Sequence, residues 1–112
     1  MSRRSKLWAA PLLLVCLFAP LTAWAQFDTG QISGYVRDAT GSVIPGADVT
    51  VTNEATGLVR RVVTNDTGYY VAPNLPPGSY TVEAEVPGFK RFSSRGNRVA
   101  AGLAVAVNAN LQ

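Results

Sequence analysis

The sequence has no histidine, and its one cysteine, Cys16, lies in an apolar N-terminal segment. Histidine is the usual general base of enzymes, so the Ser-His-Asp arrangement and the ordinary zinc sites are excluded. With no other cysteine, the rest of the chain has neither a disulfide framework nor thiol chemistry. Both tryptophans also precede residue 26. These absences argue against an enzyme, and we predict no cofactor.

The first 25 residues have the three parts of a secretory signal peptide. Two arginines and a lysine are followed by the apolar run "LWAAPLLLVCLFAPL" and then by Ala23-Trp24-Ala25. Small residues two positions apart are typical of a cleavage site, which we predict between Ala25 and Gln26. Two prolines interrupt the apolar run, so a signal-peptide helix is favoured over a membrane-spanning one, with an uncleaved anchor as the alternative.

The positive charge of the chain belongs to this leader. Three of the ten lysines and arginines lie in it, so residues 26–112 contain seven basic and seven acidic side chains. Binding to nucleic acid needs an excess of bases that neutralise phosphates, so no nucleic-acid partner is predicted. A local basic cluster remains and is interpreted as a solvated loop. Its members are Lys90, Arg91, Arg95 and Arg98.

After the leader, apolar and polar residues alternate with a period of two. The alternation is clear in "QISGYVRD", "ADVTVTN" and "LAVAVNANLQ", and each is typical of a half-buried antiparallel strand. Turn signals recur about every ten residues, as in a β-sandwich or barrel. Strands are predicted at 31–38, 47–53, 59–65, 68–73, 78–86, 89–93 and 98–111, the last with a bend or break near Gly102.

The stretch "NLPPGSYTVEAEVPGF" concentrates prolines and glycines. Its two adjacent prolines cannot donate backbone hydrogen bonds to a central ladder, so they end one strand before the next begins. Alternation places Tyr80 and Val82 on the core face and offers Glu83 and Glu85 to solvent. The following Pro-Gly turns the chain again, and Phe89 is expected to fold back over the core.

These motifs closely resemble the carboxypeptidase regulatory-like domain family, a transthyretin-like (prealbumin-like) sandwich. The matching positions are Gly34, Val36, Asp38, Gly41, Pro45-Gly46-Ala47, Val49, Thr64, Gly68, Tyr70, Leu75, Gly78, Tyr80, Val82 and Gly88-Phe89. The resemblance implies an all-β, seven-stranded Greek-key sandwich over 31–112, after a tail at 26–30. It also implies an accessory module that is not catalytic. Similar domains stand at the N-terminus of TonB-dependent outer-membrane receptors, so the chain is expected to be a truncated or a free-standing version.

Three aromatic residues form a candidate ligand surface. Tyr35 and Tyr69 fall on the outward register of their strands, and Phe92 lies beside the basic cluster. Exposed aromatic rings stack on sugar rings, as in related starch-binding sandwiches, so a carbohydrate-binding module is the alternative function. Equally, exposed aromatics can be ordinary cross-strand pairs on a sheet surface.

One short motif that is typical of an enzyme family occurs twice in the sequence. Asp-Thr-Gly occurs at 28–30 and 66–68 and is the motif of aspartic proteases, which pair two such carboxylates. The first copy is interpreted as part of a polar N-terminal tail and the second as a turn between strands, where Asp and Gly are common for conformational reasons. Asp38, Asp48 and Asp66 are not spaced as loop ligands, so no metal is predicted.

The sequence therefore predicts an exported, non-enzymatic interaction module of a Gram-negative-type cell envelope. Its expected location is the periplasm or the outer membrane and extracellular face. Its expected partner is a protein or receptor barrel, with a glycan as the alternative ligand, and the mature domain is not expected to span the membrane.

Overall fold

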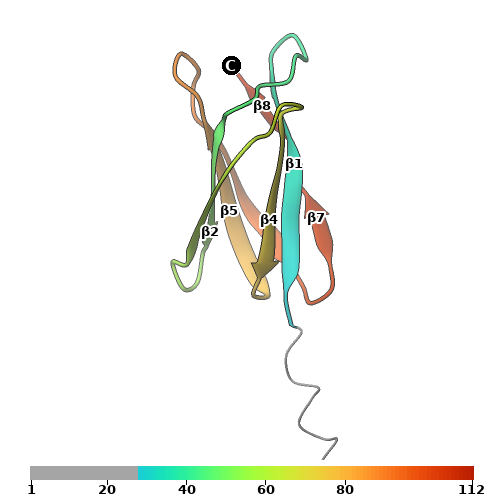
Figure 1. Cartoon of the computed structure of the whole chain (residues 1–112). Helices are drawn as coiled ribbons and strands as arrows, with labels where there is room; N and C mark the ends of the chain where they lie inside the picture. Colours follow the sequence, from blue (N-terminus) through green and yellow to red (C-terminus); the bar gives the residue numbers. More distant parts are fainter. Residues whose placement is uncertain (1–27) are drawn as a thin grey trace, which may run out of the picture.

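The computed structural model describes residues 28–112 as eight β-strands in two packed sheets (Figure 1). The strands are β1 (Gly30–Asp38), β2 (Asp48–Asn53), β3 (Val59–Val63), β4 (Tyr69–Leu75), β5 (Gly78–Glu85), β6 (Phe92–Val99), β7 (Ala104–Ala106) and β8 (Ala109–Leu111). No helix occurs in this range, so the predicted all-β sandwich is confirmed. The predicted leader and its cleavage site at Ala25 and Gln26 lie outside the described residues.

The two sheets differ in how their strands pair. In the first sheet, β1 pairs with β4 antiparallel but with β7 and β8 parallel. The second sheet has the order β3-β2-β5-β6, with every neighbouring pair antiparallel. The antiparallel expectation for the last strand is therefore wrong. Parallel neighbours need a long crossover, and here the chain between β1 and β7 forms β4 and all four strands of the other sheet.

The C-terminal strands also number one more than predicted. The basic cluster contributes Arg95 and Arg98 to β6, so the loop interpretation is wrong for these two residues. Gly96, at φ +72°, and a shifted register against β5 accommodate them in the strand. The chain then breaks twice: near Gly102, as expected, and again between β7 and β8.

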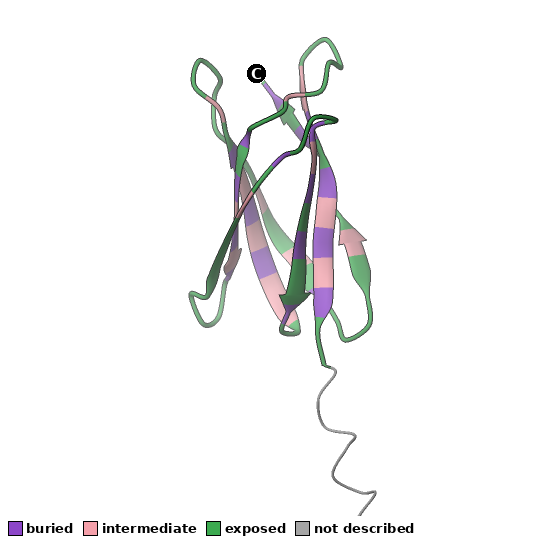
Figure 2. Ribbon diagram, viewed as in Figure 1, coloured by how far each residue is buried: buried purple, intermediate pink, exposed green. Residues whose placement is uncertain are grey.

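The core fills the space between the sheets and follows the alternation of the sequence (Figure 2). Tyr80 and Val82 are buried as predicted, whereas Glu85 is exposed. Phe89 is 37% exposed, so the expectation that it covers the core is wrong. The turn before it closes locally, with Phe89 N donating to the Val86 carbonyl, and leaves the ring outside. Leu103 is exposed because the chain is turning there and has not yet entered β7.

The central strand β1 lies unusually close to the C-terminal segment at Gly34. A Cβ atom added to Gly34 would stand 2.0 Å from the backbone oxygen of Val107. The same oxygen accepts a hydrogen bond of 2.5 Å from the buried hydroxyl of Tyr70. The Val107 carbonyl thus links the C-terminal segment to Tyr70 of β4, and it fits there because Gly34 has no side chain.

Candidate functional site

The outer face of the sheet around β1 carries the predicted aromatic pair. Its outward positions carry no acidic side chain and are mostly small, amide-bearing or aromatic. They are Gln31, Ser33, Tyr35, Arg37, Tyr69, Val71, Pro73, Ala104, Ala106, Asn108 and Asn110. The face is therefore close to neutral, with one cation.

Tyr35 and Tyr69 are direct cross-strand partners on β1 and β4. Their ring centroids lie 4.9 Å apart at an interplanar angle of 55°. The guanidinium of Arg37 lies 4.6 Å from the centroid of the Tyr35 ring, within the range of a cation–π contact. Tyr35 is 37% exposed and Tyr69 is half-buried. The three side chains form a small ordered platform, which we call the tyrosine platform.

Asn108 positions this platform from the C-terminal segment. Its side-chain Oδ1 accepts a hydrogen bond of 2.9 Å from the backbone N–H of Tyr35. Val107 N donates to the carbonyl of Ser33 at 2.8 Å just before it. The side chain thus takes the place of a backbone acceptor at the gap between β7 and β8. Sequence reasoning did not assign this role to Asn108, since nothing local places residue 108 beside residue 35.

Phe92 is not part of the platform. It lies on β6 in the other sheet and is half-buried against the core. Of the three aromatic residues predicted as a ligand surface, the structure brings two together and separates the third.

Tyr70 follows Tyr69 in β4, so its side chain lies on the opposite, core-facing side of the sheet. Burial, followed by the influence of Tyr69, raises the pKa of Tyr70 far above its usual value. Its hydroxyl therefore keeps its proton at neutral pH and donates to Val107. Its role in the described structure is to hold two strands together.

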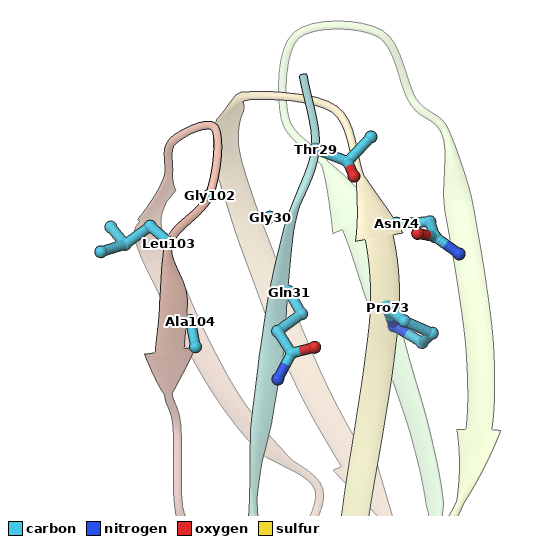
Figure 3. A pocket seen from close by; sticks show the side chains of 8 residues that line it. All are labelled: Thr29, Gly30, Gln31, Pro73, Asn74, Gly102, Leu103 and Ala104. Atoms are coloured by element: carbon cyan, nitrogen blue, oxygen red, sulfur yellow. The ribbon is translucent and has the colours of Figure 1, made fainter. Parts of the chain in front are cut away.

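A shallow hollow of about 350 Å³ lies at the end of the sandwich where β1 begins (Figure 3). Gly102, Leu103 and Ala104 line it on one side of β1, and Pro73 and Asn74 on the other. Its remaining lining residues also have no ionisable side chain. The hollow can therefore offer amide and hydroxyl contacts but no acid or base.

The outer face of the second sheet is charged. The acidic and basic side chains on this face or beside it are Asp48, Glu54, Glu83, Glu85, Arg61, Arg91, Arg95 and Arg98. Arg91 forms an ion pair of 2.9 Å with Glu85, and the hydrogen bond to Glu85 raises the pKa of Arg91. Such exposed pairs contribute little to stability.

Glu54 links a loop to strands β5 and β6 on this face. Its Oε2 accepts hydrogen bonds from Gly96 N at 2.8 Å and from the Thr81 hydroxyl at 3.0 Å. These bonds favour the charged form and lower the pKa of Glu54. The carboxylate is thus committed to a structural contact between the start of the 54–58 loop and β6.

The second Asp-Thr-Gly copy is a turn, as interpreted from the sequence. Asn65 Oδ1 accepts hydrogen bonds from Thr67 N, the Thr67 hydroxyl and Tyr69 N, at 2.8 to 3.0 Å. Asp38 organises Thr40 and Ser42 in the same way, and the Thr40 hydroxyl lowers the pKa of Asp38. Among residues 28–112, no three potential metal ligands lie together.

The described residues contain no helix of the length and hydrophobicity that crossing a bilayer requires. Two packed sheets with cross-strand contacts and hydrogen-bonded turns define the protein as a β-sandwich. The chain belongs to the carboxypeptidase regulatory-like domain family, whose model matches residues 31–112.

Among characterised proteins, the chain is similar to the TonB-dependent transporter Oar of Myxococcus xanthus. The two are 38% identical over 91 residues, which are 80% of this chain and 8% of the transporter. The chain thus corresponds to a small part of that relative.

Solved structures show the same fold at low sequence identity. The TIE protein of Bacillus anthracis has a TM-score of 0.63 and 24% identity, covering 75% of this chain and 16% of that one. A putative carbohydrate binding protein from Bacteroides uniformis has a TM-score of 0.58 and 20% identity, and the match covers 73% of this chain and 40% of that one. Catechol 1,2-dioxygenase from Acinetobacter radioresistens has a TM-score of 0.59 and 15% identity, and the match covers 77% of this chain and 52% of that one. At these identities the likeness concerns the fold alone.

Proposed function

We propose that the chain is an exported, non-enzymatic accessory domain of a TonB-dependent outer-membrane transport system. The observation that carries this proposal is the 38% identity to a TonB-dependent transporter over most of this chain. The leader pattern is consistent with it, with Gln26 as the first mature residue. The domain then works in a Gram-negative-type envelope, beside or joined to a receptor barrel.

The proposed mechanism is structural. A rigid sandwich presents edges and loops to a protein partner while its own polar groups stay occupied. Glu54, Asn65 and Asp38 are engaged in turns and loop contacts, and Tyr70 keeps its proton. The lack of histidine in the sequence supports a non-catalytic role in the same way.

Cell fractionation tests this proposal. The chain, with a C-terminal tag, is produced in its own type of bacterium, and the mature N-terminus is sequenced. We expect cleavage between Ala25 and Gln26, recovery with the envelope, and photo-crosslinks to a TonB-dependent receptor. An Ala25→Lys variant is the control, because a large charged residue blocks cleavage. Recovery in the cytoplasm with an intact leader would overturn export, and envelope recovery without receptor crosslinks would overturn the transport association.

Carbohydrate binding is the second candidate function, and the tyrosine platform favours it. Two adjacent, partly exposed rings on a neutral face offer a stacking surface for a sugar. Glycan-array and affinity-gel binding would be compared between the wild type and the Tyr35→Ala/Tyr69→Ala double variant. Phe89→Ala is the matched control, because it removes an exposed aromatic ring elsewhere. Equal binding by all three proteins would rule out the platform as a sugar site.

A further inference from the structure

The sandwich has four free strand edges in residues 28–112, and they are not equivalent. The edge of β4 contains Pro73, which has no N–H to donate. The edge of β6 has a register shift and Gly96 at positive φ, and the last edge consists of two strands of three residues each. Only β3 offers five consecutive residues in unshifted register with its neighbour, with neither proline nor glycine.

The hydrogen bonds at the two ends of β3 establish which of its residues face outward. Asn53 N donates to the Leu58 carbonyl, and Thr64 N donates to the Ala47 carbonyl. In an antiparallel ladder, hydrogen-bonded pairs alternate with non-bonded ones. Counting inward from both ends, the backbone groups of Val59, Arg61 and Val63 therefore point away from β2. Within the described chain these three residues make no backbone hydrogen bond beyond the ladder.

The side chains of these same residues also lie on the solvent side. Val59 and Val63 are 44% and 59% exposed, and Arg61 stands between them. Within residues 28–112 the one ion pair is Arg91 with Glu85, so Arg61 is not paired. The edge thus shows a valine, an arginine and a valine in alternation, next to unused donors and acceptors.

Arg60, between the outward residues of β3, lies on the opposite face of the strand. Its partner in the ladder, Val51, is a core residue, so Arg60 is on the core-facing register. Its guanidinium reaches across to the carbonyl of Asn74 on β4, at 3.4 Å. Inward-pointing charge on an edge strand is one of the devices that resist unspecific edge-to-edge pairing, so any strand added to β3 must be selected by its side chains.

A second copy of this chain fits the edge poorly. Antiparallel pairing of β3 with itself in full register would place Arg61 directly opposite Arg61, and like charges in that position are destabilising. A carboxylate in the same position would form a cross-strand ion pair. We propose that β3 docks an extended segment of a partner protein as an added strand, with an acidic residue opposite Arg61 and apolar residues opposite Val59 and Val63. This inference goes beyond the transporter association and does not depend on it.

A palindromic peptide tests the proposal in either strand direction. The probe has the core Val-Thr-Glu-Thr-Val, so that glutamate faces Arg61 whether the added strand is parallel or antiparallel. The comparison peptides carry lysine at the centre or are N-methylated along one edge, which removes the backbone donors. The purified chain is titrated and followed by amide NMR shifts and hydrogen exchange.

We expect slower exchange at Val59, Arg61 and Val63, and about fivefold tighter binding of the glutamate peptide than of the lysine peptide. Arg61→Glu should invert this preference. Arg98→Glu on β6 is the matched control, since it makes the same change of charge on another exposed edge. Circular dichroism would confirm that both variants fold.

Four results would overturn the proposal. The first is no binding at peptide concentrations up to about millimolar. The second is equal binding of the N-methylated peptide, which would mean charge attraction without an added strand. The third is a loss of affinity for the glutamate peptide in Arg98→Glu that equals the loss in Arg61→Glu. The fourth is concentration-dependent dimerisation of the free chain through β3, which would make a second copy the occupant.

Discussion

The two sheets of this sandwich are held together by different kinds of contact. The second sheet consists of antiparallel neighbours and carries a charged outer face, with exposed contacts such as Arg91 to Glu85. The first joins β1 to the C-terminal strands β7 and β8 through parallel pairing around Gly34. Its outer face is almost uncharged. We therefore expect the free energy of unfolding to depend most on the backbone contacts of the first sheet and little on the exposed charges of the second.

Gly34→Ala should lower the free energy of unfolding most, because it adds a methyl group where β1 and the C-terminal segment lie closest together. The new methyl group would meet the Val107 backbone, which cannot move without breaking its bonds to Ser33 and Tyr70. We expect a loss of about 3 kcal/mol or more in the free energy of unfolding, measured by urea denaturation. Gly41→Ala is the control: its site is open, and only its φ of +90° opposes a side chain. Equal losses in the two variants would contradict the importance of the close approach.

Tyr70→Phe should come next. It removes the buried hydroxyl that donates to Val107 and is expected to cost about 1 to 3 kcal/mol. The pKa of Tyr70 is raised in the folded state, so the folded protein binds the proton more tightly than the unfolded chain. Wild-type stability should therefore fall as pH rises above about 10, by up to about 1.4 kcal/mol per pH unit, and Tyr70→Phe should lack that part of the slope. Identical alkaline slopes would show that the hydroxyl is not shielded.

Asn108→Ala should have a smaller effect, confined to the platform side. It leaves the Tyr35 N–H without its side-chain acceptor and is expected to cost about 1 kcal/mol. Hydrogen exchange at Tyr35 should accelerate more than exchange in β2 and β5. Asn110→Ala, on the same outer face, is the matched control. Unchanged exchange at Tyr35 would mean that Asn108 does not position it.

Glu54→Gln should give the smallest effect, because it acts on the charged sheet. The pKa of Glu54 is lowered in the folded state, first by the Gly96 N–H. Its stabilising contribution is therefore full above the ordinary carboxyl pKa of 4.5 and disappears as pH falls through the folded value. Urea midpoints at pH 7 should be slightly lower for the variant, and the difference between the two proteins should shrink as pH falls below 4.5. A difference that stays constant down to the lowest pH at which both proteins fold would show that the carboxylate charge is not responsible.

Much of the fold could be predicted because it rests on local patterns. The alternation around Tyr80 and Val82 identifies the core face of β5, and the adjacent prolines after Leu75 mark the boundary between β4 and β5. The outward register of Tyr35 and Tyr69 was predictable for the same reason. Their pairing at 4.9 Å was not, because it depends on the register between β1 and β4.

The sequence by itself determined the class of fold, the strand faces and the family, since these follow from periodicity two, turn residues and ordered motifs. The tertiary structure alone decided three further features: the parallel pairing of β7 and β8 with β1, the place of Asn108 beside Tyr35, and the open edge at β3. Each joins residues far apart in the chain or concerns which strand lacks a neighbour. Alternation in sequence says which face a side chain takes, but it carries no information on which strand lies beside it.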